Sequence, residues 1–131
     1  MHDRAVVIII DKDEILLLHR IKKGKEYYVI PGGTIEEGEK PEETAVREIK
    51  EETNLDIELG EVFCSVNDSW HNGVYFLAKK FSGELKLGGP ELKRINDNNQ
   101  YQLEWVHKDS LQKLLLYPKE VKEKIMKYFS A

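Results

Sequence analysis

Three glutamates spaced three and four residues apart, Glu48, Glu51 and Glu52, are the residues of this chain best suited to chemistry. On an α-helix, Glu51 and Glu52 fall at roughly −60° and +40° from Glu48, so the three carboxylates share one face. Ala45 and Ile49 form an apolar stripe beside them, so we expect the helix to bury that stripe and aim its acids out of the core. Like charges this close raise one another's pKa unless a cation neutralises them, and a hard divalent ion with oxygen ligands is the natural candidate.

The acidity of the chain is concentrated around these glutamates. Residues 36–52 hold eight glutamates and three basic residues, a net charge of −5, whereas all the other residues together sum to +1. A solvated charged helix face is the ordinary explanation of such a segment, and the helix alone does not exclude it. The spacing of the residues around the helix favours a more specific interpretation.

Residues 33–55 follow the pattern G-x5-E-x7-R-E-I-x-E-E-x-N-L. This segment resembles the Nudix hydrolase family, whose box reads G-x5-E-x7-R-E-U-x-E-E-x-G-U, where U is an aliphatic residue. One specified position departs from the family pattern, because Asn54 stands in place of a glycine. That position ends the helix with positive φ, and asparagine is the next best residue there after glycine, so we expect the site to remain intact.

The resemblance implies both a fold and a reaction. The fold is an α/β/α sandwich with a mixed β-sheet, in which the box forms a loop, a helix and a second loop. The reaction is hydrolysis of a nucleoside diphosphate linked to another group, with Mg²⁺ or Mn²⁺. Carried over by position, the resemblance implies that Glu48, Glu51 and Glu52 are metal ligands or, for one of them, the base that activates water. Gly32 would add a carbonyl ligand, and Arg47 and Glu39 would form a bridge that holds the loop on the helix. Gly33 and Asn54 would be structural positions of the box.

Elementary chemistry agrees with this assignment. Water attacks phosphorus in line with the leaving group, and the charge that develops on the phosphate oxygens needs cations to neutralise it. An acidic surface repels a polyphosphate, so this segment attracts an anionic substrate only when it holds a metal ion.

The resemblance also implies a further carboxylate from a loop downstream of the box, as a metal ligand or general base. Glu91 is the best-placed candidate in this chain, and Glu104 is the alternative. Arg94, in the same loop as Glu91, could contact a phosphate of the substrate. For each of these residues the alternative is a solvated side chain without a role in the reaction.

Aromatic and amide side chains outside the box are candidates for binding a nucleobase. Tyr28 and Trp70 could stack on a base, whereas Tyr75 and Phe76 are more typical of a hydrophobic core. Asn99 could recognise a base edge through its amide group, although its neighbours also favour a turn.

The elements that must position these residues follow from hydrophobic patterning and helix signals. Pro41 suits the first turn of the box helix, and Pro118 is expected to open a last helix. Asp109 or Ser110 is expected to cap a short helix that ends near Tyr117. The expected strands are residues 4–10 and 15–18, which form a hairpin, then 27–30, 55–64, 73–78, 84–87 as a short edge strand, and 101–106, with a long loop over 88–100.

Length and composition indicate one domain covering residues 1–131. The chain has 131 residues and a mass of 15.3 kDa, with 40% hydrophobic and 34% charged residues. Its single cysteine, Cys64, cannot form an intrachain disulfide, and its apolar run of residues 5–10 is too short for a signal or spanning segment. A net charge of −4 gives no basic footprint for nucleic acid. We therefore expect a cytoplasmic protein, monomer or homodimer, that binds neither membranes nor nucleic acid polymers.

The leading functional hypothesis is Mg²⁺-dependent hydrolysis of nucleoside triphosphates, including oxidised ones, to a nucleoside monophosphate and pyrophosphate. ADP-ribose, nucleotide sugars and dinucleoside polyphosphates are alternative substrates. A non-catalytic nucleotide sensor is an alternative of another class, although such a protein would be expected to lose box acids. A protein-interaction module with an acidic helix is a third alternative, which predicts that charge matters and spacing does not.

Overall fold

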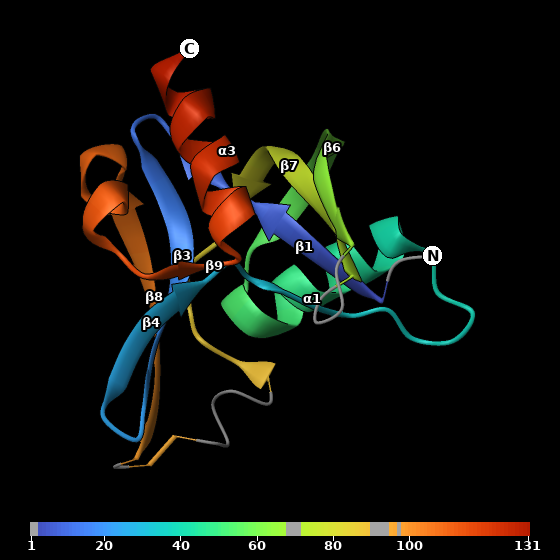
Figure 1. The fold of residues 1–131 in the computed structure, drawn as a ribbon. Coiled ribbons are helices and arrows are strands. Elements are labelled where there is room, and N and C mark those ends of the chain that lie inside the picture. Colours follow the sequence, from blue (N-terminus) through green and yellow to red (C-terminus); the bar gives the residue numbers. More distant parts are fainter. Residues whose placement is uncertain (1–2, 68–71, 90–94, 97) are drawn as a thin grey trace.

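The strands form two sheets in the computed structural model, which describes residues 3–67, 72–89, 95–96 and 98–131 (Figure 1). The first sheet has the order β5-β1-β7-β6, in which β1 and β7 are parallel and the other pairs antiparallel. Its strands are β1 (Arg4–Ile8), β5 (Gly32–Thr34), β6 (Asp56–Asn67) and β7 (Asn72–Ser82).

The second sheet has the order β2-β3-β4-β9, with β8 paired to β3. Its strands are β2 (Ile10–Asp11), β3 (Glu14–Lys22), β4 (Lys25–Val29), β8 (Asn99–His107) and β9 (Leu116–Tyr117). The expected single strand over residues 4–10 is therefore divided between the two sheets, because β1 and β2 pair with different neighbours on either side of Ile9.

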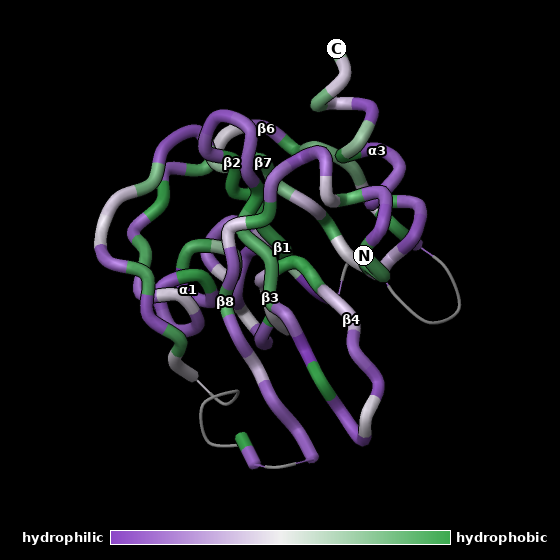
Figure 2. Tube along the Cα trace, turned by 90° about the vertical axis from the view of Figure 1, so that its left-hand side faces the viewer, coloured by the Kyte–Doolittle hydropathy of each residue, from purple (hydrophilic) through white to green (hydrophobic). Residues whose placement is uncertain are grey.

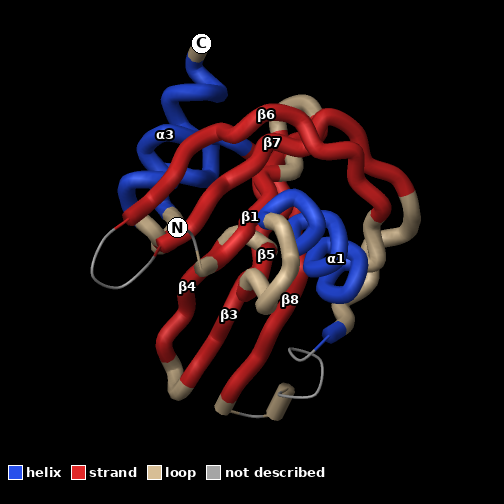
Figure 3. Tube along the Cα trace, turned by 90° about the vertical axis from the view of Figure 1, so that its right-hand side faces the viewer, coloured by secondary structure: helices blue, strands red, loops and turns tan. Residues whose placement is uncertain are grey.

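Helices cover both faces of the strands, so the expected α/β class is confirmed. Helix α1 (Pro41–Thr53) and helix α3 (Lys119–Ser130) lie apart with strands between them in Figure 3. Side chains of a strand alternate between its faces, so β1 contributes to two cores. Val6 and Ile8 pack in the cluster that includes residues of α3, whereas Ala5 and Val7 pack in the cluster that includes residues of α1. Figure 2 shows hydrophobic colours along β1 and β3 in the middle of the molecule.

The expected edge strand over residues 84–87 is wrong. This segment pairs with no strand in the part of the chain that the structure describes, and its backbone instead follows the C-terminal end of α1. Lys86 N donates to Thr53 O at 2.9 Å, and Gly88 N donates to Glu52 O at 3.0 Å. The last carbonyls of a helix have no partners within the helix. Here they accept hydrogen bonds from the backbone N–H groups of Lys86 and Gly88, which in an edge strand would bond to a neighbouring strand.

The C-terminal region differs from expectation at the short helix and at the strand that follows it. The short helix is a 3₁₀ helix, η1 (Lys108–Lys113), and it ends before Tyr117, which belongs to β9. The expected cap at Asp109 or Ser110 is wrong, because His107 is the capping residue and its Nδ1 accepts from Asp109 N at 3.1 Å. Strand β9 pairs in parallel with β4 and buries Leu116 in the core. Helix α3 follows Pro118 as predicted and buries Val121 and Ile125. Among the described residues, none of the helices has the length and apolarity that crossing a membrane requires.

Candidate active site

Both ends of α1 are fixed by local signals in the sequence. At the start, Pro41 occupies the first turn, and Lys40 N donates to Glu43 Oε1 at 2.9 Å. At the end, Asn54 adopts the left-handed conformation with φ 67°, and its N–H donates to Lys50 O. Asn54 therefore ends the helix in the conformation predicted for it, which a glycine would adopt at lower cost.

The three glutamates of α1 differ strongly in exposure. Glu51 has a side chain that is 48% exposed and Glu48 one that is 18% exposed, whereas Glu52 as a residue is only 3% exposed. The expectation that all three acids point out of the core is thus wrong for Glu52. A helical wheel cannot show this burial, because residues 84–88, distant in sequence, run along the end of the helix that carries Glu52.

Arg47 joins the loop to the helix and also contacts the acidic face. Its Nε and NH2 donate to the two carboxylate oxygens of Glu39 at 2.7 and 2.9 Å, and NH2 reaches Thr34 O at 3.4 Å. Its NH1 donates to Glu48 Oε1 at 3.1 Å and to both oxygens of Glu51 at 3.3 Å. The bridge between Arg47 and Glu39 that the resemblance implied is present, and the same guanidinium is the cation between Glu48 and Glu51.

Glu39 gives the protein a predictable sensitivity to acid. Hydrogen bonds from Arg47, and then from the Thr44 hydroxyl, lower the pKa of Glu39 from 4.5 to about 2. A carboxylate whose pKa is lower in the folded state stabilises the fold above its unfolded pKa, and this contribution is lost as the pH falls towards the folded pKa. We expect the melting temperature of the wild type to decrease as the pH is lowered from 4.5 to 2. Glu39→Gln should weaken this dependence of the melting temperature on pH.

Thermal melts from pH 7 to pH 2 test this expectation. Glu37→Gln is the matched control, because Glu37 lies in the same loop and is exposed. If both variants show the same pH dependence as the wild type, the Glu39 ion pair does not contribute to acid stability.

Gly33 provides the space in which the Glu48 carboxylate lies. A Cβ added to Gly33 would stand 2.1 Å from Glu48 Cδ and 2.4 Å from Glu48 Oε2. The neighbouring Gly32 is equally constrained, since a Cβ there would stand 2.5 Å from Ala5 O in β1. The two glycines thus let β5 lie against β1 on one side and let Glu48 pack on the loop on the other.

The donors on this face fit a hard divalent cation by their chemistry. Glu48, Glu51 and Glu52 supply carboxylates and Gly32 a carbonyl, all oxygen ligands of the kind that Mg²⁺ prefers. As the side chains stand, no group of three His, Cys, Asp or Glu within the described ranges is gathered closely enough to hold an ion. Convergence would require Glu48 and Glu51 to turn from Arg47 NH1, so the metal assignment of these residues stays a prediction.

Arg20, on the second sheet, lies between two tyrosines, an arrangement that the sequence did not predict. Arg20 of β3 lies over the ring of Tyr101 at 4.4 Å and over that of Tyr27 at 5.4 Å, and its NH2 donates to the Tyr101 hydroxyl at 2.6 Å. Leu16, four residues earlier, packs in the cluster that includes residues of α1. Because strand side chains alternate, Arg20 faces the same side of the sheet as α1.

The residues predicted to bind a base have mixed surroundings. Tyr28 is 8% exposed and stacks on His19, with ring centroids 4.3 Å apart and planes 8° apart. Asn99 begins β8, and its backbone pairs with Asn96 in the turn that was the alternative for it. Tyr75 and Phe76 are buried core residues. Trp70, Glu91 and Arg94, which were also predicted to be site residues, lie outside the described residues.

Glu104, the alternative to Glu91, has a partner away from the acidic face. Glu104 contacts His19 Nδ1 and lies on the face of β8 opposite to Tyr101. Because Tyr101 and Arg20 face the α1 side, Glu104 is directed away from the carboxylates of α1. Burial raises the pKa of the Cys64 thiol, which disfavours its reactive thiolate form.

Layers of helix, sheet and helix, with a glycine loop seated on an acidic helix, define the Nudix class of proteins. The family model of the NUDIX domain matches residues 1–129 of this chain. The chain therefore belongs to the NUDIX domain family, the family of the Nudix pyrophosphohydrolases.

Named relatives and solved structures agree with this membership. An ADP-ribose pyrophosphatase of Methanocaldococcus jannaschii is 36% identical over 113 residues, which are 79% of this chain and 67% of that protein. An ADP-ribose pyrophosphatase of Bacillus subtilis is 41% identical over 51 residues, 37% of this chain and 28% of that protein. The crystal structure of a MutT NUDIX hydrolase from Burkholderia pseudomallei has a TM-score of 0.73 and 25% identity, covering 95% of this chain and 97% of that one.

Proposed function

We propose that this protein hydrolyses a phosphoanhydride bond of small nucleotides with Mg²⁺ or Mn²⁺, and that nucleoside triphosphates, including oxidised ones, yield a nucleoside monophosphate and pyrophosphate. The observation that carries the proposal is the acidic face of α1, where Glu48 is seated on Gly33 and Glu52 is buried beside it. A solvated charged helix face would not require a glycine against one of its acids. Retention of all three box acids favours the hydrolase over a nucleotide sensor without activity.

The roles of the residues follow from their positions. Water attacks phosphorus, the bond to the leaving phosphate breaks, and one carboxylate accepts the proton of the water. Glu52, shielded from bulk solvent, is our candidate for that base, and Arg47 orients Glu48 and Glu51 without contacting the reacting atoms. A bound divalent ion would neutralise charge on the phosphate oxygens. Arg20 and Arg94 are candidates for contacting a substrate phosphate. Glu91 is the candidate for a further carboxylate that would serve as a metal ligand or general base.

ADP-ribose is a second candidate substrate. The observation that favours it is the name of the archaeal relative, an ADP-ribose pyrophosphatase that is 36% identical over 79% of this chain. Hydrolysis of ADP-ribose and of a nucleoside triphosphate both break a phosphoanhydride next to a nucleoside monophosphate, so the acidic face serves either substrate. We further propose a cytoplasmic location and a small-molecule partner, with no membrane or nucleic acid polymer involved.

Product analysis by ³¹P NMR tests the proposal. Incubation of ATP with protein and Mg²⁺ is expected to give AMP and pyrophosphate, and incubation of ADP-ribose to give AMP and ribose 5-phosphate. Release of ADP and orthophosphate from ATP would contradict the proposed bond cleavage.

Exchanging Lys50 and Glu51 separates spacing from charge. The double variant Lys50→Glu/Glu51→Lys keeps the net charge but moves one carboxylate by about 100° around the helix. We expect kcat/KM to fall by about 100-fold or more, since misplacing a catalytic group by about 1 Å already costs that much. The matched control exchanges Lys119 and Glu120, two exposed residues of α3. Equal activity of both double variants would contradict the role assigned to Glu51, because it would show that the position of this carboxylate does not matter.

A further inference from the structure

Residues 84–88, which we call the strap, lie along the C-terminal end of α1. Two backbone hydrogen bonds attach them to the helix: Lys86 N donates to Thr53 O at 2.9 Å, and Gly88 N donates to Glu52 O at 3.0 Å. Both acceptors belong to the last turn of α1, where carbonyl groups have no partner within the helix. The strap therefore completes the hydrogen bonding of the helix end that carries Glu52.

Asn54 attaches the start of the strap through its side chain. Its Nδ2 donates to Glu84 O at 2.8 Å. The other two hydrogen bonds join backbone groups and are open to almost any sequence, whereas this one depends on a carboxamide at position 54. The Nudix box has a glycine at this position, and a glycine has no side-chain donor. The one departure of this chain from the box therefore supplies a tether that the family residue would not.

The strap lies close enough to α1 to exclude water from the end of the helix. A Cβ added to Gly88 would stand 2.6 Å from Glu51 O, so the two backbones are in direct contact there. Leu85 packs against the hydrophobic cluster that includes residues of α1. Beside this contact Glu52 is 3% exposed, whereas the side chain of Glu51, its neighbour in the sequence, is 48% exposed. The strap thus shields one carboxylate of the acidic face and leaves the other in water.

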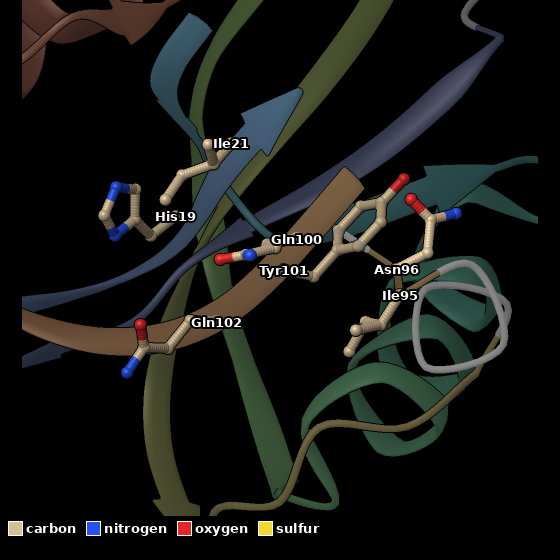
Figure 4. Close-up of a pocket in the computed structure, with 7 residues that line it drawn as sticks. All are labelled: His19, Ile21, Ile95, Asn96, Gln100, Tyr101 and Gln102. Atoms are coloured by element: carbon tan, nitrogen blue, oxygen red, sulfur yellow. The ribbon is translucent and has the colours of Figure 1, made fainter. Parts of the chain in front are cut away.

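The chain is held again beyond the strap, at the second sheet. Ile95 and Asn96 line a cavity of about 300 Å³ together with Tyr101 of β8 (Figure 4). Asn96 and Asn99 donate to each other through their backbones at 2.9 and 3.1 Å. With the chain fixed at the start of β8, Asn54 fixes it at the end of α1. The position of the strap therefore depends on both attachments.

We propose that Asn54 is a positioning residue, which fixes the strap through Glu84 O so that the strap keeps the Glu52 carboxylate shielded from bulk water. The proposal rests on the proposed function, because it takes Glu52 to be the base of that reaction. Exclusion of water strengthens the electrostatic interactions of a charged group in a site, so the shielding of Glu52 matters for the rate. Asn54 acts through the strap and is given no contact with the reacting atoms.

Asn54→Gly removes the tether and restores the residue of the family box. Glycine adopts the φ of 67° found here at no steric cost, so the helix should end as before and the melting temperature should change little. Asn54→Asp is the second variant: it keeps the size of the side chain and its tolerance of the left-handed conformation, but presents an oxygen to Glu84 O in place of the donor. Asn98→Gly, the same change at an exposed turn residue, is the matched control.

Labelling of carboxylates with a water-soluble carbodiimide and an amine, followed by mass spectrometry, measures the shielding of Glu52 without metal or nucleotide. We expect labelling in the wild type to be slow at Glu52 and fast at Glu51, in line with their exposure. Asn54→Gly and Asn54→Asp should each raise the rate at Glu52 by roughly three- to tenfold, the factor that corresponds to the loss of one hydrogen bond. The rate at Glu51 should stay unchanged, and Asn98→Gly should match the wild type at both residues.

Kinetic measurements then distinguish failure of the positioning role from failure of the proposed function. If ATP or ADP-ribose is turned over, both Asn54 variants should lower kcat by roughly tenfold with little change in KM, because loss of the outer contacts of a site costs about that much. Unchanged labelling of Glu52 in both variants, or faster labelling together with the kcat of the wild type, would overturn the positioning role. Faster labelling of Glu52 in a protein that hydrolyses nothing would support the shielding by the strap and contradict the proposed function.

Discussion

Glu52→Gln is expected to lower kcat by roughly 10²- to 10⁴-fold while the protein remains folded. The substitution keeps the size of the side chain and removes the ability of the carboxylate to carry charge and accept a proton, the contribution that general base catalysis makes to a rate. Glu52 is 3% exposed, so bulk water cannot readily replace the lost group. Steady-state kinetics on the best nucleotide, with circular dichroism as a check of folding, measures the effect.

Glu42→Gln is the matched control for this prediction. Glu42 lies in the first turn of the same helix and is exposed, so its substitution removes one negative charge from α1 without touching the three acids. Retention of full activity in Glu52→Gln, or an equal loss in both variants, would show that the buried carboxylate has no particular role.

Gly33→Ala is expected to reduce kcat/KM by about 100-fold or more. The added methyl group would stand 2.1 Å from Glu48 Cδ, so the carboxylate must leave its position. Displacement of a catalytic group by about 1 Å is sufficient for a loss of that size. The change adds no charge and removes no hydrogen-bonding group, so the loss would report the position of Glu48.

Gly38→Ala separates this effect from a general loss of stability. Gly38 has φ +81°, so alanine is strained there, but a Cβ would meet nothing within 4 Å. We expect Gly38→Ala to lower the melting temperature with near-normal activity, and Gly33→Ala to lose activity at temperatures where it is folded. Near-normal activity of Gly33→Ala would mean that Glu48 does not need its observed position.

The acidic helix was predictable because its signals are local. Pro41 at its start and Asn54 at its end fix the boundaries, and the spacing of Arg47 and Glu39 identifies the pair that holds the loop. The burial of Glu52 was not predictable in the same way, because it depends on where residues 84–88 lie.

Contacts between strands were the least predictable part of the site. Arg20 is adjacent to Tyr27 and Tyr101 only because β3 pairs with β4 and β8 in one particular register. A shift of one residue in either pairing would place a tyrosine on the opposite face of the sheet. Strand β9 has only two residues and pairs with β4 in parallel, so no local pattern distinguished it from the end of a short helix.

The most direct test of the account is release of phosphate and pyrophosphate from a panel of nucleotides by the wild-type protein, with Mg²⁺ and with a chelator in its place. The panel holds nucleoside triphosphates, 8-oxo-dGTP, ADP-ribose, a nucleotide sugar and a dinucleoside polyphosphate. The account predicts hydrolysis of at least one member that requires Mg²⁺ and yields a nucleoside monophosphate. No hydrolysis of any member with Mg²⁺, together with tight binding of one of them that does not depend on metal, would contradict it and identify the protein as a sensor.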